Sequence, residues 1–201
     1  MVRTRSAGVE HRTYARVMTT FADKPTIRGD RVMLRPMGAQ DADSMWADVH
    51  DDEITHFTGT HADFTREQID RWCSSRSGQP DRLDLAVVDP DTGVWLGEVV
   101  INEWDADNRS CSFRIALGAN GRDRGAGTEA TRLIVDHVFD TIDDPPVNRL
   151  SLEVFEFNPR GLAVYEKVGF VREGVLRDAL CWQGEFHDAI VMSILRRDRE
   201  G

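Results

Sequence analysis

The chain has 201 residues, of which 25 are Lys or Arg and 35 are Asp or Glu, so its formal net charge is -10. Hydrophobic residues make up 40% of the sequence, which supports one packed domain and excludes collagen-like, low-complexity and wholly disordered chains. No run approaches about 18 consecutive apolar residues, so we expect no transmembrane helix and no membrane partner. Phosphate binding along a nucleic acid needs clustered cations, so the acidic balance also argues against a nucleic-acid partner. It fits either a cationic partner or a charged surface that only keeps the protein soluble.

The charge is distributed unevenly along the chain. Residues 1–25 carry five basic and two acidic residues, and they lack the apolar segment of a secretory signal. We therefore expect residues 1–25 to be a disordered basic leader, residues 26–196 to form a single domain, and residues 197–201 to be a tail.

Cysteine and histidine usage predicts neither disulfides nor a metal site. The three cysteines form no CxxC pair: Cys73, Cys111 and Cys181. Their odd number fits a reducing, cytoplasmic environment better than a disulfide framework. His50, His56 and His61 lie on a loop-like stretch without a cluster of partner ligands, so we expect no metal.

The first half of the expected domain contains one strand followed by two helices. Val32–Arg35 predicts a short strand, and the apolar spacing after Asp41 predicts a helix over Ala42–Val49. A second helix is expected to begin at Thr65, which has the capping-box spacing to Gln68.

The second half predicts a series of strands interrupted by two helices. The expected elements are strands over 84–88, 94–101 and 111–117, a Gly-rich turn over 118–127, a helix over 128–140, a strand over 149–157, a helix between the Asn158 cap and Gly169, and strands over 170–176 and 188–195. Short turns join the three central strands, so they should pair antiparallel. The order β-α-α-β-β-β-α-β-α-β-β predicts an α+β domain with a mixed, mostly antiparallel sheet.

A Gly-rich turn between a strand and a helix is a candidate anion site. Its sequence from Arg122 to Thr128 is Arg-Asp-Arg-Gly-Ala-Gly-Thr. Backbone N–H groups and the helix dipole favour an anion at such a helix start, although the pattern alone also suits an ordinary flexible turn. It lacks the Gly-Lys-[Ser/Thr] of a P-loop, and it does not follow the first strand of a βαβ unit as a dinucleotide fingerprint does.

A second motif makes the resemblance specific. The pattern R-x-x-G-x-G-T-E-A at residues 122–130 is followed at residues 158–174 by N-P-R-x-x-x-x-Y-E-K-x-G-F-x-x-E-G. The pair resembles the Gcn5-related N-acetyltransferase (GNAT) superfamily, with closest similarity to its ribosomal-protein N-terminal acetyltransferase branch and the spermidine and small-amine relatives. The resemblance covers roughly residues 26–196. It implies the GNAT fold, in which helices cover both faces of the central sheet.

The resemblance also implies acetyl-CoA as co-substrate, without a metal. In this family the Gly-rich turn binds the pyrophosphate of coenzyme A, and the pantetheine arm lies along the fourth strand, held by backbone groups. The residues that match these positions are Arg122, Asp123, Arg124, Gly125, Ala126, Gly127 and Thr128 in the turn, Ile115 and Leu117 on the strand, and Asn158 and Tyr165 beside the pantetheine and the sulfur.

The implied chemistry is direct attack of an amine on the thioester in a ternary complex. We expect Tyr165 to be the general acid for the thiolate, with Asn158 beside it, and a strand N–H near Ala116 or Leu117 to stabilise the oxyanion. Glu153 resembles the base of one ribosomal-protein acetyltransferase group, twelve residues before the Tyr. Glu98 is a rival base, and deprotonation through water is a third route. No Cys–His spacing in the sequence supports a mechanism through an acyl-cysteine intermediate.

The acceptor pocket is the part of the site that the sequence defines least. In this superfamily the segments corresponding to Trp46–Trp72 and Arg177–His187 shape the acceptor pocket, and here they combine acids with aromatics. Such a wall suits a cationic primary amine, a protein N-terminus or a polyamine, although a solvated acidic surface is the alternative. Other functional readings are a non-catalytic acyl-CoA-binding regulatory module and a small-molecule or antibiotic acetyltransferase. The resemblance also allows a homodimer.

Overall fold

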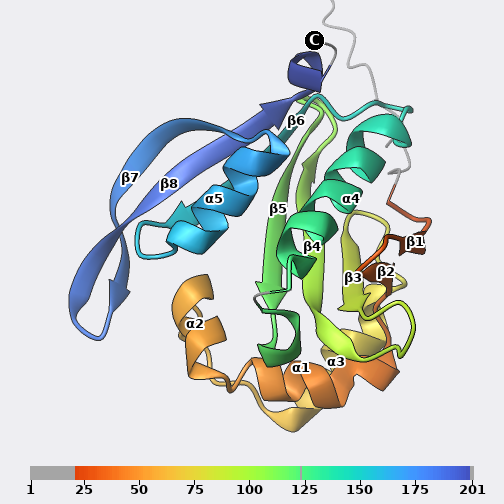
Figure 1. Ribbon diagram of the computed structural model, residues 1–201, viewed down its shortest axis with the longest axis vertical. Helices are drawn as coiled ribbons and strands as arrows, with labels where there is room; N and C mark the ends of the chain where they lie inside the picture. Colours follow the sequence, from red (N-terminus) through yellow and green to blue (C-terminus); the bar gives the residue numbers. More distant parts are fainter. Residues whose placement is uncertain (1–20, 123, 200–201) are drawn as a thin grey trace, which may run out of the picture.

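The computed structural model describes residues 21–122 and 124–199, whose strands form one sheet (Figure 1). The eight strands of this part of the chain are β1 (Ile27–Arg28), β2 (Met33–Pro36), β3 (Leu83–Val88), β4 (Trp95–Asp105), β5 (Ser110–Leu117), β6 (Arg149–Phe155), β7 (Val171–Trp182) and β8 (Glu185–Leu195). Their order is β1-β2-β3-β4-β5-β6-β8-β7, and only β5 and β6 are parallel neighbours. The predicted α+β fold with a mixed, mostly antiparallel sheet is confirmed.

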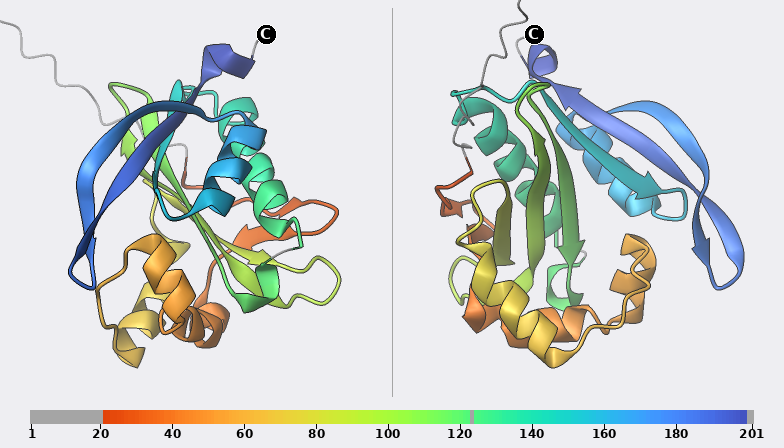
Figure 2. Two further views of the ribbon diagram at one scale, coloured as in Figure 1. Left: turned by 60° about the vertical axis from the view of Figure 1, so that its left-hand side comes forward. Right: turned by 180° about the vertical axis from the view of Figure 1, so that it is seen from behind.

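Helices cover both faces of the sheet, as expected. They are α1 (Ala42–Asp48), α2 (Asp52–Thr58), α3 (Arg66–Arg76), α4 (Ala126–Asp140) and α5 (Pro159–Val168). Figures 1 and 2 show α4 and α5 on one face and α1 and α3 against the other. The larger apolar core lies on the α4–α5 side, and a smaller core around Met45, Ile69 and Cys73 lies on the α1–α3 side. No helix in the described residues is long and apolar enough to cross a bilayer.

Helix α2 departs from the sequence expectation. The stretch around His56 was expected to be loop-like, but the side chain of Asp51 caps a seven-residue helix by accepting from the Ile54 N–H at 2.9 Å. Gly59 ends the helix in the left-handed conformation. Ile54 is its single buried residue, so the segment lacks the apolar periodicity that identifies a helix in a sequence.

Local capping follows the predictions elsewhere. The Thr65 hydroxyl accepts from the Gln68 N–H, and the Gln68 side chain accepts from the Thr65 N–H, so the capping box of α3 is complete. The Asn158 side chain caps α5 by accepting from the Gly161 N–H at 2.8 Å. Gly169 ends α5 in the left-handed conformation.

The packed region includes residues before the expected boundary at residue 26. Phe21 is fully buried in the larger core. The Lys24 ammonium donates to the backbone carbonyls of Phe21, Gln79 and Arg82. Residues 21–25 are therefore part of the folded domain, whereas residues 1–20 of the expected leader lie outside the described residues.

The parallel contact between β5 and β6 is short. Pairing runs only from Ser110–Arg149 to Ser112–Ser151. Beyond that point β5 continues to Leu117 with β4 as its partner, while β6 continues beside β8. The two strands therefore diverge, as the view from behind shows (Figure 2), and no described strand pairs with this edge of β5 beyond Ser112.

A bulge in β4 sets which side chains face α1 and α3. The register of β4 against β3 skips Leu96, so Trp95 and Glu98 both face the α1–α3 layer. Gly97 has a φ of 147°, and a Cβ added there would lie 2.1 Å from the Ala116 carbonyl oxygen. Only glycine fits this close approach between β4 and β5.

Replacing Gly97 should therefore be strongly destabilising. We expect Gly97→Ala to lower the free energy of unfolding by about 2–4 kcal/mol, because the Ala116 carbonyl must move and the backbone is strained. Urea unfolding measures the change. The matched control is Gly174→Ala on β7, where an added Cβ meets no atom within 4 Å, and there we expect less than about 0.5 kcal/mol. Equal effects of the two substitutions would contradict this account of the bulge.

Candidate active site

The turn after β5 presents the N-terminus of α4. Gly125 has a φ of 74°, in the left-handed region that favours glycine, and α4 begins at Ala126. Gly127 packs so closely that an added Cβ would lie 3.1 Å from Leu117 Cδ1. The first N–H groups of α4 have no acceptor within the helix, so this end favours an anion.

A cation-rich cavity of about 400 Å³ lies beside this helix end. It is lined by Asp30, Arg31, Arg124, Gly125, Thr128, Glu129, Arg132 and Lys167. The Glu129 carboxylate accepts from the backbone N–H groups of Asp30 and Arg31, at 2.7 and 2.9 Å, so it is committed to the β1–β2 turn. Four cations from separate elements surround the cavity, which is the donor set that a polyphosphate needs.

Three of these cations were not among the predicted site residues. Arg31, Arg132 and Lys167 reach the cavity from the β1–β2 turn, α4 and α5. Arg132 follows Thr128 by one helical turn, and that spacing is a signal available in the sequence. Arg31 is far away in the sequence, so only the folded chain shows its position.

The predicted turn residues divide into two groups. Arg124, Gly125 and Thr128 line the cavity, whereas the side chain of Ala126 is buried and Asp123 lies outside the described residues. Gly127 contributes packing rather than lining, as described above.

Arg122 forms ion pairs with two carboxylates. Its guanidinium donates to Asp51 at 2.9 Å and to Glu53 at 2.8 Å, and its Nε donates to the Leu117 carbonyl at 3.3 Å. Asp51 and Glu53 lie at the start of α2. Arg122 therefore ties α2 to the turn that carries the α4 N-terminus, and in this structure its charge is already neutralised.

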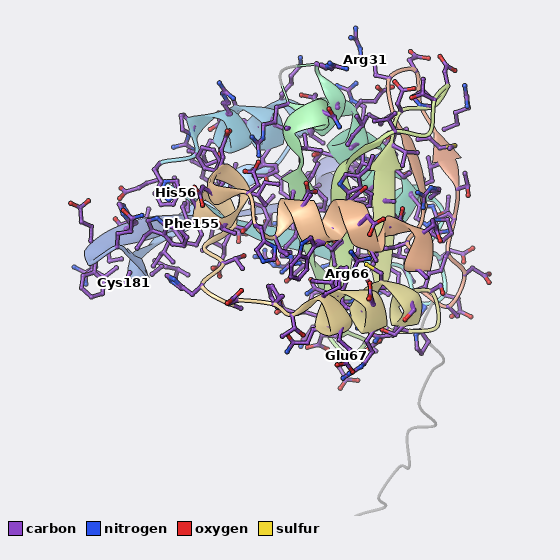
Figure 3. All side chains as sticks on the ribbon, turned by 90° about the horizontal axis from the view of Figure 1, so that it is seen from below. Arg31, His56, Arg66, Glu67, Phe155 and Cys181 are labelled. Atoms are coloured by element: carbon purple, nitrogen blue, oxygen red, sulfur yellow. The ribbon has the colours of Figure 1, made fainter. Side chains whose placement is uncertain are left out.

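The other end of α2 is held by aromatic rings. The His56 imidazole stacks on Phe157 with ring centroids 4.2 Å apart and lies 5.3 Å from the Trp182 ring. Phe157 also meets His187 edge-on at 4.9 Å. Figure 3 shows His56 beside Phe155, on the side of the molecule where the β7–β8 hairpin projects.

Helix α2 thus spans the divergence between β5 and β6. One end is joined to the turn after β5, and the other is stacked on the chain after β6 and on the hairpin. Both predicted acceptor segments, Trp46–Trp72 and Arg177–His187, meet along this helix. The result is a wall of acids and aromatics across one side of the opening.

Asn158, Ile115 and Leu117 have clear structural positions. Asn158 caps α5, so its side-chain oxygen is engaged by the Gly161 N–H. Ile115 and Leu117 lie on the part of β5 that has left β6, and the Ile115 side chain packs against the larger core. Their backbone groups are therefore on the strand whose edge is open.

Tyr165 lies on the α4–α5 side of the sheet. Its ring is buried and meets Phe113 and Phe170 edge-on, at 6.2 and 5.8 Å. Burial raises the pKa of the Tyr165 hydroxyl to about 12. The hydroxyl therefore stays protonated at neutral pH, as a proton donor must.

The two candidate bases differ sharply in environment. Glu153 is exposed on β6 and shares a face with Ser151 and Phe155. Glu98 is 9% exposed on β4, and burial raises its pKa to about 7. The register places both on the sheet face that carries α2, opposite to Tyr165.

The raised pKa of Glu98 predicts a pH-dependent stability. A buried carboxyl with a raised pKa favours folding while it is protonated, and this contribution is lost as the pH rises from about 4.5 through about 7. Glu98→Gln should therefore be more stable than the wild type at pH near 8, by about 2–3 kcal/mol, and the gap should close near pH 4.5. Thermal unfolding across this range measures it. A constant gap would mean that Glu98 does not titrate in this window.

The buried thiols are poor nucleophiles. Burial raises the pKa of Cys111 to about 12 and that of Cys73 to about 11. Cys181 is exposed, and all three are free. Among the described residues no group of three or more His, Cys, Asp or Glu is placed to hold a metal ion.

Comparison with known families identifies the fold. Residues 31–171, which are more than half of the chain, match the family described as an acetyltransferase (GNAT) domain. The chain belongs to the GNAT acetyltransferase family. It is therefore an acetyl-CoA-dependent N-acetyltransferase, as the resemblance implied.

Individual GNAT relatives agree on the family and differ in acceptor. An uncharacterised N-acetyltransferase, p20 of Bacillus licheniformis, is 26% identical over 88% of this chain and 99% of its own length. YdaF of Bacillus subtilis, which carries the provisional name of a ribosomal N-acetyltransferase, is 28% identical over 54% of this chain and 58% of its own. The crystal structure of spermidine N-acetyltransferase from Vibrio cholerae, in complex with CoA and spermine, has a TM-score of 0.78 and 19% identity over 86% of this chain and 100% of its own. The last comparison supports the fold alone.

Proposed function

We propose that this GNAT protein acetylates a cationic primary amine, of the kind carried by a protein N-terminus or a polyamine, by direct attack in a ternary complex. The observation that carries the proposal is the divergence of β5 and β6. It separates a cation-rich helix end on one side from an acidic and aromatic wall on the other.

The cation-rich cavity fits the phosphates of acetyl-CoA. The N–H groups at the start of α4, with Arg31, Arg124, Arg132 and Lys167 around them, would hold these phosphates. The open edge of β5 offers unpaired backbone groups to the pantetheine amides, in the manner of an added strand. The co-substrate would supply the activated acetyl group as a thioester at the divergence.

The chain's own residues then position the reactants and move protons. A backbone N–H of β5 near Ala116 or Leu117 stabilises the oxyanion, and Tyr165 gives its proton to the departing thiolate. Two carboxylates on the acceptor face, Glu98 and Glu153, are candidates for the base that takes the proton of the ammonium. Holding both reactants in one cleft supplies much of the rate enhancement.

Removing cavity cations should weaken binding of coenzyme A. We expect Arg31→Ala and Lys167→Ala each to raise the Kd about 5-fold, because each loses about 1 kcal/mol of phosphate attraction, and the losses should shrink at high salt. Isothermal titration with coenzyme A measures this. Arg71→Ala is the matched control, since Arg71 is an exposed cation on α3 that pairs with Glu67. A loss equal to that of Arg71→Ala would place the phosphates elsewhere.

Acetyl transfer itself is tested by release of free thiol from acetyl-CoA. The acceptors should be peptides with N-terminal Ala, Ser or Thr, the polyamines spermidine and spermine, and an aminoglycoside. We expect release with peptides or polyamines, because both carry a cationic primary amine. Release with the aminoglycoside alone would favour a small-molecule acetyltransferase, and release with none would favour the non-catalytic acyl-CoA-binding module.

Within the same assay, Tyr165→Phe should lower kcat about 10–100-fold, because the thiolate then leaves without a proton donor. The Phe ring keeps the contacts with Phe113 and Phe170, so the Kd for coenzyme A should stay within about 2-fold of the wild type. Unchanged turnover would remove Tyr165 from the mechanism.

A further inference from the structure

One buried carboxylate on the acceptor face lacks a hydrogen-bond donor. Among the described residues, none donates to Glu98 Oε2, although this atom is shielded from solvent. Buried polar atoms in proteins are normally paired, and an unpaired carboxylate oxygen is costly to bury. The arrangement calls for a partner that the folded chain does not itself provide.

The position of Glu98 points to the reaction centre. Glu98 pairs with Ala116 of β5, and by that point β5 has already separated from β6, whose last pair is Ser112–Ser151. Paired strands lie about 5 Å apart, so Glu98 stands one strand away from the open edge. The side chains of Glu98 and Ala116 also share the face on which α2 spans the opening.

The carboxylates near Glu98 have hydrogen-bond donors, whereas Glu98 Oε2 has none among the described residues. The Arg114 guanidinium of β5 approaches Glu98 Oε1 at 3.8 Å, too far for a hydrogen bond, and the Arg114 side chain is 63% exposed. Asp84 of β3 receives two hydrogen bonds from Arg82, and Asp48 of α1 receives one from Trp95. Both neighbouring carboxylates are therefore committed to donors.

Helix α3 also lies beside Glu98. It contributes Cys73, whose thiol stays protonated, and Arg76, whose guanidinium lies over the Trp72 ring and donates to the Trp72 carbonyl. Burial, aided by Asp84 and Asp48 and opposed by Arg114, raises the pKa of Glu98 to about 7. At that pKa a carboxylate can take a proton near neutral pH and release it again.

We propose that Glu98 is the group that takes the proton from the acceptor's ammonium before the amine attacks the thioester. This inference rests on the acetyl-transfer function proposed above. The ammonium loses one proton to Glu98, and the neutral nitrogen forms a bond to the carbonyl carbon. The C–S bond then breaks, the sulfur takes a proton from Tyr165, and the acetylated nitrogen returns its second proton to the tyrosinate. Glu98 finally releases its proton to solvent.

Glu153 is the natural rival, because it matches the base of a relative group by sequence. It is exposed on β6, on the far side of the divergence from Glu98. An exposed carboxylate there can attract a cationic acceptor through its charge without taking a proton. The two assignments therefore predict different pH dependences for the two Gln variants.

The deciding experiment measures kcat and KM for thiol release from acetyl-CoA with spermidine and with a Ser-initiated peptide, from about pH 6 to pH 10. The proteins are the wild type, Glu98→Gln, Glu153→Gln and Glu103→Gln. Glu103 is the matched control, because it is an exposed carboxylate on the same strand. The Kd for coenzyme A is measured for each protein.

With the Ser-initiated peptide we expect Glu98→Gln to lower kcat about 10-fold near pH 7 and less than about 3-fold near pH 10, where the α-amine, with a pKa of about 8, is already neutral. With spermidine, whose primary amines have pKa values of about 10, the loss near pH 7 should be larger and the recovery should begin only near pH 10. The Kd of Glu98→Gln for coenzyme A should be unchanged, and Glu103→Gln should match the wild type at every pH. Recovery at high pH is the signature of a lost base, which a merely structural role would not give.

Three results would overturn the inference. The first is a Glu98→Gln variant that equals the wild type at all pH values, and the second is a Glu98→Gln variant with a uniform loss that does not recover at high pH. In a third, Glu153→Gln alone would give the recovering profile, which assigns the base to Glu153. Absence of thiol release from the wild type with either acceptor overturns the proposed function and this inference together, whereas the first three leave the function standing.

Discussion

The short parallel contact between β5 and β6 is the constraint on which the rest of the structure depends. A parallel pair that stops after three residue pairs leaves one edge of β5 without a strand partner among the described residues, which a folded protein normally avoids. Here the divergence brings three things to one place: the open edge of β5, the N-terminus of α4 after it, and the start of α5 after β6. The chemistry of an acyl transferase needs all three.

The divergence of β5 and β6 separates a basic part of the domain from an acidic part. The chain is strongly acidic overall, yet the helix end beside β5 is surrounded by three arginines and a lysine from four separate segments of the chain. The opposite wall, along α2, carries the acids. Arg122 lies at the boundary, because it belongs to the turn before α4 but is bound by Asp51 and Glu53 of the α2 start.

Much of the fold was readable from the sequence, because its signals are local. The caps at Thr65 and Asn158 and the alternation in the central strands depend on neighbouring residues. The site was less readable, since Arg31 reaches the cavity through tertiary structure and α2 is held by contacts rather than by periodicity. The burial of Glu98 comes from the packing of α1 and α3 over its face of β4, a tertiary contact that the sequence of the strand does not show.

The distribution of thiols has a practical consequence. Cys73 and Cys111 are buried with raised pKa values, whereas Cys181 is exposed on the β7–β8 hairpin, close in sequence to Trp182, which packs near His56 of α2. A maleimide fluorophore would therefore label the native protein at a single position, without any cysteine being introduced or removed. That dye would lie beside the proposed acceptor wall and away from the cation-rich cavity, so under the proposed function its emission should respond to acceptor binding separately from co-substrate binding (Figure 3).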